Sequence, residues 1–251
     1  MKKEIVEVKD QLPALNQAEQ QAMYGDIERE DLKIPRLSIL ESMSPEVADS
    51  LGKPGDFFVK GLNLNLGSNP VEVVVLMRSK SRMRWAPLDD GGGILCQADD
   101  GKNGVGEPGG SCQDCDLKNW KGREQPLCDL YENFIVMVRG VELALPVALS
   151  GSRSRLSGLR DLNTMLELHR LQQRPFYDKA YQIRAVKKQN PNVKGSNYHV
   201  FGFFPGNKNE IIPLEEQRMY SEMFKAFSRL NVKIERDIEA KPATASDGPS
   251  I

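Results

Sequence analysis

Residues Val71–Trp85 read VEVVVLMRSKSRMRW, and this stretch decides the class of fold. The first seven residues, VEVVVLM, are mostly β-branched or large and apolar, which suits a buried, pleated strand. The next eight, RSKSRMRW, alternate cations with serine, methionine and tryptophan, the period of two expected of a strand. The stretch therefore predicts one long strand that changes from buried to charged along its length.

Further elements on either side of this strand indicate a mainly β (α+β) protein. Strands are expected at 34–40, 56–60 and 131–138, with 141–149 as a hairpin partner, and a second hairpin at 180–188 and 197–204. Amphipathic helices are expected at 152–171 and 213–230. Because strands do not alternate with helices, a parallel α/β fold is excluded. We expect a small OB-like barrel, a partly open five-stranded fold that binds oligonucleotides, with flanking helices.

Composition predicts how the chain is divided. Residues 1–30 are polar and acidic and are expected to form a mobile arm, with at most a short helix. The OB-like domain would span 31–235 and carry an insertion at 89–129. Residues 236–251 are small, polar and proline-bearing, as in a disordered tail.

The four cysteines of the chain all lie within one 33-residue window. Their spacing is C-x15-C-x2-C-x12-C, and they are Cys96, Cys112, Cys115 and Cys128. Four thiolates that converge form a tetrahedral site favoured by Zn²⁺. The surrounding sequence is rich in glycine and too poor in apolar residues to fold alone, so we expect a structural, zinc-ribbon-like insertion.

Other interpretations of the cysteines stay open, namely two disulfides, free thiols or an iron–sulfur cluster. The N-terminus, MKKEIVEVKD, has no apolar signal region, so we expect a cytoplasmic protein, where a reducing environment disfavours disulfides. Four cysteines leave no open position for a catalytic water, so a catalytic zinc is not expected.

Charge is distributed unevenly along the chain. The net charge is −1, yet residues 139–200 carry 11 cations and 4 anions. Such a basic segment between acidic ends suggests a site for a polyanion.

Two basic motifs are candidates for that site. Alternation in the long strand places four cations on one face, where they would follow the phosphates of an extended single strand. These are Arg78, Lys80, Arg82 and Arg84. The second motif, SGSRSRLSGLR at 150–160, combines small residues with Arg153 and Arg155 before a helix, an arrangement that attracts phosphate. The alternatives are a solvated edge strand and an ordinary helix start.

A third motif interleaves aromatic residues with cations in the hairpin at 177–204. Aromatic rings stack on any base while cations meet the phosphates, which is what sequence-tolerant single-strand binding requires. Trp85 of the long strand is a further stacking candidate. The hairpin candidates are Tyr181, Arg184, Lys187, Tyr198 and Phe201. At least one of the three hairpin rings is expected to be exposed, although alternation assigns others to the core.

Signatures of enzymes and of membrane proteins are not found. The sequence has no phosphate-binding loop of the GxxxxGK[ST] type, no GxSxG and no HExxH. The pairs Asp89-Asp90 and Asp99-Asp100 suggest a nuclease metal site, but turn-forming aspartates account for them as well. No apolar run approaches the roughly 18 residues of a membrane span.

On these residues the chain resembles the single-stranded-DNA-binding proteins of tailed bacteriophages. The resemblance covers about residues 32–204 and rests on DLKIPRLSIL, VEVVVLMRSKSRMRW, the four-cysteine insertion, YENFIVMV and YHVFGFF. The chain is also similar in plan to the T4-type helix-destabilising protein, an OB-fold with a zinc subdomain. The resemblance implies a non-enzymatic protein that coats single-stranded DNA in replication or recombination, with phage replication or recombination proteins as partners.

Two features depart from that family. Its zinc ligands include a histidine, whereas this chain offers four cysteines. Its acidic C-terminal tail recruits partners, whereas residues 239–251 contain only Glu239 and Asp247 as acids. A protein-interaction module supported by zinc, and a metal-dependent DNA-processing enzyme, therefore stay open as alternatives. The oligomeric state is not predicted.

Overall fold

The structure is a computed structural model that describes residues 34–87, 89, 91–140, 146–189, 197–206 and 211–230, with residues 16, 18, 19 and 22. The chain divides into two compact units, Met1–Lys33 and Ile34–Ile251. In the first unit, Asn16 and Glu19 exchange hydrogen bonds of 2.8 and 3.0 Å between backbone N–H and side chain, a capping box. Most of the expected acidic arm 1–30, and all of the expected tail 236–251, lie outside the described residues.

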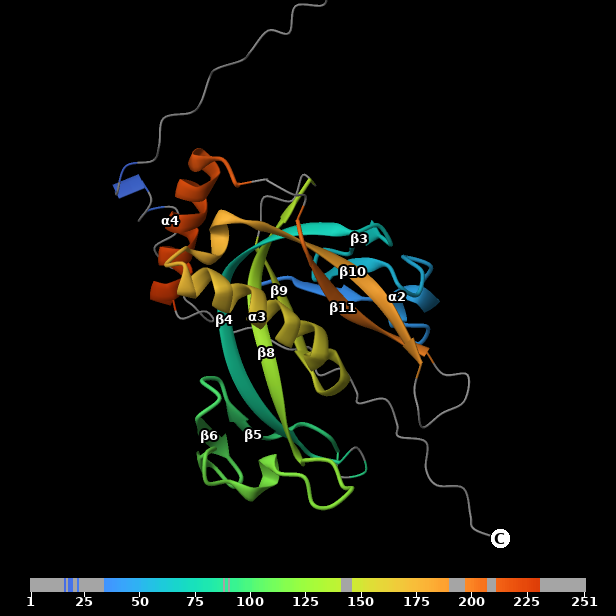
Figure 1. Cartoon of the computed structure of the whole chain (residues 1–251). Helices are drawn as coiled ribbons and strands as arrows, with labels where there is room; N and C mark the ends of the chain where they lie inside the picture. The colour runs from blue at the N-terminus through green and yellow to red at the C-terminus, as the bar shows by residue number, and fades with distance from the viewer. Residues whose placement is uncertain are drawn as a thin grey trace, which may run out of the picture. The chain divides into compact units, whose positions relative to one another are not determined.

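The second unit is built around one open, mixed sheet of eleven strands (Figure 1). The strands are β1 Arg36–Ile39, β2 Phe57–Lys60, β3 Leu64–Gly67, β4 Val71–Trp85, β5 Ile94–Ala98, β6 Asn103–Gly106, β7 Gly110–Ser111, β8 Cys128–Arg139, β9 Pro146–Ser152, β10 Ala180–Gln189 and β11 Asn197–Pro205. Their order is β3-β2-β1-β9-β8-β4-β5-β6-β7, with β10 joined to β4 and β11 to β10. Among the described pairs, only β1 and β9 are parallel.

Strand β4 is the long strand with which three other strands of this sheet pair. One of its edges pairs with β8 from Glu72 to Arg84. Its other edge pairs with β10 over Val71–Val74 and with β5 over Arg82–Trp85. A bulge at Leu76 shifts the register against β8, which changes which residues face each side beyond that point. The same strand therefore belongs to both the main sheet and the cysteine-bearing insertion.

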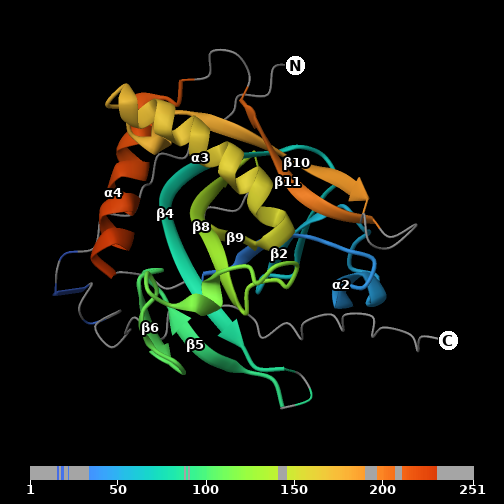
Figure 2. The same ribbon diagram turned by 60° about the horizontal axis from the view of Figure 1, so that its bottom comes forward.

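Helices lie beside this sheet rather than between its strands. They are α2 Pro45–Ala48, α3 Leu156–Leu171 and α4 Leu214–Leu230, with the short turns η3 Asp116–Lys118, η4 Arg153–Arg155 and η5 Phe176–Asp178. Both views show α3 lying along β11 (Figures 1 and 2). The guanidinium of Arg139 holds α4 through Glu216 at 3.2 Å. No helix within the described ranges is long and apolar enough to cross a membrane.

Two apolar clusters occupy the two faces of the sheet. The larger one packs Leu159, Leu162 and Leu166 of α3 against strand residues such as Phe134 and Phe57. The smaller cluster joins strand residues of β4 and β8 to α4. Valines of β4 alternate between the two clusters, which explains why its first half is apolar on both faces.

The structure confirms a mainly β fold with few helices and leaves the finer expectation open. An OB-like barrel is not confirmed, because the strand order is that of an open sheet. Strand β3 was not expected, since LNLG is too short to show a period. The expected partner strand 141–149 appears as β9, with 141–145 outside the described residues.

Candidate nucleic-acid interface and cysteine pocket

The four cations of β4 point to one face of the sheet. Arg78 lies directly opposite Phe134, a member of the larger apolar cluster, so this face is the one that α3 covers. Lys80, Arg82 and Arg84 follow at alternate positions. The expected alternation is therefore present in the register of the strand.

A buried carboxylate, Glu132 of β8, neutralises part of this row. Its side chain is 4% exposed and lies 3.1 Å from Arg78 Nη2 and 3.3 Å from Lys80 Nζ. The sequence of β4 itself has no acid between these cations, and it could not show the acid that the neighbouring strand supplies. The two cations remain partly exposed, so they keep access to solvent.

The first and second basic motifs meet at the start of α3. Lys80 lies opposite Glu132, which in turn lies opposite Gly151 of β9, so the three form one row across the sheet. A Cβ on Gly151 would lie 3.0 Å from Arg155 Cβ, so the second motif packs directly on this row. Arg160, one turn into the helix, is exposed.

Arg153 and Arg155 have partners of their own. Arg153 Nε donates to Asp129 Oδ1 at 2.6 Å, and its backbone has a positive φ of 50°. Arg155 Nη2 lies 3.9 Å from Glu41 Oε1. Glu41 also accepts a 2.8 Å hydrogen bond from the backbone N–H of His199. Both arginines are thus positioned by acids from other strands or loops while staying partly exposed.

The hairpin β10–β11 does not place its rings as expected. Tyr181 and Phe201 are 3% and 1% exposed and belong to the larger apolar cluster, so the prediction that they stack on bases is wrong. Burial between α3 and the sheet raises the pKa of Tyr181, and its hydroxyl lies 3.3 Å from His169 Nε2. Alternation alone could not show which face α3 would cover.

Other side chains of the hairpin remain accessible. Lys188 is exposed, lies opposite the half-buried Tyr198, and places its Nζ 3.4 Å from Ser157 Oγ at the start of α3. Lys187 is exposed beside it. Arg184 stacks 4.4 Å above the ring of Phe204, an exposed aromatic that the sequence argument did not single out. These two alternate with the buried Ile183 and Phe203, so they point away from the larger apolar cluster.

The position of Trp85 in the structure does not favour stacking on a base. It is half-buried, and its indole N–H donates to the hydroxyl of Tyr131 at 3.2 Å. Its position alternates with the cations of β4, so it occupies the opposite face from them. The exposed indole of the chain is instead Trp120, in the insertion.

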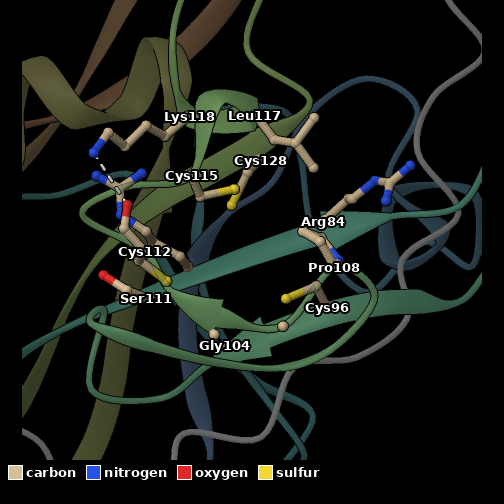
Figure 3. Close-up of a pocket in the computed structure, with 13 residues that line it drawn as sticks. Arg84, Cys96, Gly104, Pro108, Ser111, Cys112, Cys115, Leu117, Lys118 and Cys128 are labelled. Carbon is tan, nitrogen blue, oxygen red and sulfur yellow. Dashed lines mark hydrogen bonds between the residues drawn. The ribbon is translucent and has the colours of Figure 1, made fainter.

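The four cysteines line one pocket, shown in Figure 3. They come from β5, from the segment around η3 and from the first residue of β8. The other lining residues are Arg82, Arg84, Gly104, Pro108, Gly109, Gly110, Ser111, Leu117 and Lys118. All four thiols are free. The four cysteines thus line one pocket, and their binding of a metal ion stays a prediction.

Strand register explains how two of the cysteines reach this pocket. Cys96 of β5 and Cys128 of β8 both lie directly opposite Arg84, so all three point to the same face. A Cβ on Gly104 would lie 2.9 Å from Cys96 Sγ, so a larger residue there would press on the thiol. Lys118 Nζ donates to the carbonyl of Cys112 at 3.1 Å and fixes the segment that carries Cys112 and Cys115.

The pocket favours neutral thiols as long as no cation enters it. Burial raises the pKa of Cys112 and Cys128, and the nearby Arg82 partly opposes this effect. Within the described residues, no three cysteine, histidine, aspartate or glutamate side chains are grouped closely enough to hold a metal ion as they lie. The thiolate donor set suits zinc, but the thiols would have to turn inward to share one ion.

The acidic pair Asp99–Asp100 of the insertion makes local contacts within a turn. Asp100 accepts hydrogen bonds from the backbone N–H groups of Lys102 and Asn103, and these bonds lower its pKa to about 2. Asp99 accepts from Gln97 Nε2. This is the ordinary use of aspartate in a loop and offers no support for a nuclease site.

Comparison with known proteins matches the chain to a family. A family model described as Pam3 phage gp34-like protein matches residues 4–233. No curated protein and no solved structure matches the chain.

Proposed function

The chain belongs to the Pam3 phage gp34-like family, and we propose that this phage protein binds single-stranded DNA without catalysing a reaction on it. It would coat and protect the strand during phage replication or recombination. The proposed binding surface is the basic cluster, defined as two cations of β4 on the face that α3 covers together with cations at the start of α3 and on the neighbouring hairpin. Its members are Arg78, Lys80, Arg153, Arg155, Arg160 and Lys188.

The observation that carries this proposal is the meeting of cations from separate segments at one place. The row Lys80–Glu132–Gly151 joins β4 to the second basic motif, and the contact between Lys188 and Ser157 adds the hairpin. Acidic side chains are present as well, namely Glu132, Asp129 and Glu41. Each of them contacts at least one cation, so it both positions that cation and offsets part of its charge, and the six cations of the cluster still outnumber these three acids.

Stacking would involve fewer rings than the sequence suggested. Tyr198 lies opposite Lys188 and is half-buried, so this ring lies beside one member of the basic cluster. The Arg184–Phe204 pair offers a second, separate platform. A cation beside an exposed ring suits the contact of a base and its phosphate. An OB-like arrangement of the central strands remains part of the proposal.

The first test is a titration of the full chain with a fluorescent oligo-dT strand and with a duplex of equal length, at two salt concentrations. We expect the single strand to bind more tightly. Binding should weaken with salt, with a slope that falls by roughly 0.7 for each contacting cation removed. Arg155→Ala and Lys188→Ala should each lower the slope by about that amount.

Lys225→Ala is the matched control, because Lys225 is an exposed cation on α4 that pairs with Glu222. It removes the same charge from a helix outside the basic cluster. If Lys225→Ala lowered the salt slope as much as Lys188→Ala, binding would be a property of overall charge. Equal affinity for single strand and duplex would overturn the proposal.

A second function is favoured by a different observation. The insertion exposes large apolar side chains, with Val105 at 79%, Trp120 at 63% and Leu127 at 59% exposed. Apolar side chains that gather into one exposed patch are typical of protein-interaction surfaces. If the chain bound no oligonucleotide at low salt, an adaptor that uses the insertion to bind a replication or host protein would become the better account.

A further inference from the structure

We propose that Cys96, Cys112, Cys115 and Cys128 bind one Zn²⁺ as a structural centre, and that Arg82 and Arg84 balance its charge. The inference does not depend on DNA binding. It assigns two cations of β4 to the metal centre rather than to phosphates. The basic cluster defined above contains neither of them.

The first argument is that three separate segments deliver every cysteine of the chain to one pocket. Cys96 and Cys128 arrive on strands that flank β4, and the Cys112–Cys115 pair arrives on the segment between β7 and η3. Glycines line the pocket next to them, and a side chain at Gly104 would press on Cys96 Sγ. Small residues around thiols leave room for the thiols to turn toward a shared ion.

The second argument is that the insertion has almost no apolar core. Between residues 91 and 127, all of them described, only Ala98 and Cys112 are buried. A segment of this length without a core needs a cross-link or a metal to hold its layers together. The cysteine pocket is where such a centre would join β5, the η3 segment and β8.

The third argument concerns charge. Four thiolates outnumber the charge of one Zn²⁺, so the centre would carry net negative charge. Arg82 and Arg84 line the pocket, and Arg84 begins in the same row as Cys96 and Cys128. Its Nη1 donates to the carbonyl of Glu107 at 3.2 Å, which fixes the position of the guanidinium. Cations beside a thiolate centre tune and stabilise it.

The test measures metal on the purified full chain, prepared without chelators. Elemental analysis should give about one zinc per chain, and replacement by Co²⁺ should give the visible bands of a tetrahedral thiolate site. Cys115→Ser should lose most of the zinc. Ser111→Ala is the matched control, because Ser111 lines the same pocket without supplying a thiol, and it should keep the metal.

A second comparison of variants tests whether Arg82 balances the charge of the zinc centre. Arg82→Gln should release zinc to a chelator several times faster than the unmodified chain, whereas Arg78→Gln, on the same face of β4 but outside the pocket, should not. Equal release from both variants would overturn the role of Arg82.

Three results would overturn the zinc site itself. These are substoichiometric metal without cobalt bands, two disulfides in the purified chain, or the absorption of an iron–sulfur cluster. Even if Cys115→Ser failed to fold, the zinc content of the unmodified chain would decide the question. Because zinc is measured without DNA, failure of this inference and failure of DNA binding are separate outcomes.

Discussion

Replacing Gly158 by alanine tests how closely α3 packs on the hairpin. In an exposed helix this change would stabilise the protein by about 1 kcal/mol, because alanine has the higher helix propensity. Here the new Cβ would lie 1.7 Å from the backbone oxygen of Phe201, a contact that real structures do not show. The sign of the effect therefore separates the packing seen here from ordinary helix propensity.

The magnitude follows from the displacement that the clash requires. Even a tight Cβ contact needs about 3 Å, so α3 or β11 must move by more than 1 Å. That shift would loosen Leu159, Leu162 and Leu166, which α3 buries in the larger apolar cluster. Overpacking costs roughly 1–3 kcal/mol, and a clash with backbone lies at the upper end of that range, so a net loss of about 2 kcal/mol remains after the gain of about 1 kcal/mol in propensity. The melting temperature should fall by roughly 4–8 °C.

Urea unfolding followed by circular dichroism measures this loss. Thr164→Ala is the control, since Thr164 is exposed on the same helix, and its stability should stay within about 0.5 kcal/mol of the unmodified chain. A Gly158→Ala variant that is as stable as the unmodified chain, or more stable, would refute the close approach of α3 to β11.

Two further predictions concern buried charges. Burial lowers the pKa of His169, although Asp178 lies 3.2 Å away, so the folded protein favours the neutral ring. The free energy of unfolding should therefore be highest above pH 6.5, the ordinary pKa of histidine. It should fall at lower pH by at most about 1.4 kcal/mol per pH unit. The midpoint of urea unfolding should therefore depend less on pH between pH 5 and 8 in His169→Gln than in the unmodified chain. An unchanged pH dependence would show that other groups cause it. Glu132→Gln should cost about 1 kcal/mol, because its two partners are partly exposed, and should steepen the salt dependence of oligonucleotide binding by freeing Arg78 and Lys80. A shallower or unchanged salt dependence would show that these cations do not meet phosphate.

Local sequence patterns predicted the elements but not the pairings between them. The alternation in β4 correctly placed its four cations on one face, because a period of two is a property of the strand itself. The buried Glu132 could not be paired with Arg78 and Lys80 in advance, since the register of β4 on β8 joins residues 52 to 54 positions apart. The burial of Tyr181 and Phe201 depends on α3, an element whose position the hairpin sequence does not encode.

The cysteine window was informative for a different reason. Identical rare residues in one short segment indicate convergence without any knowledge of the fold, and the four cysteines do share a pocket. The sequence could not show that Arg82 and Arg84 lie in that pocket, because they belong to a strand outside the window. The sequence also could not show that Trp120 and Phe204 are exposed while other aromatic residues are buried.

The ladder between β4 and β8 has a consequence for the evolution of the chain. The polypeptide leaves this ladder at Trp85 and returns at Cys128, which lies directly opposite Arg84. Two residues so placed are close enough to be joined by a tight hairpin turn. The cysteine-bearing segment is therefore an insertion at the end of the β4–β8 hairpin. The fold therefore allows this segment to be lengthened, replaced or removed without rerouting the chain through the rest of the sheet.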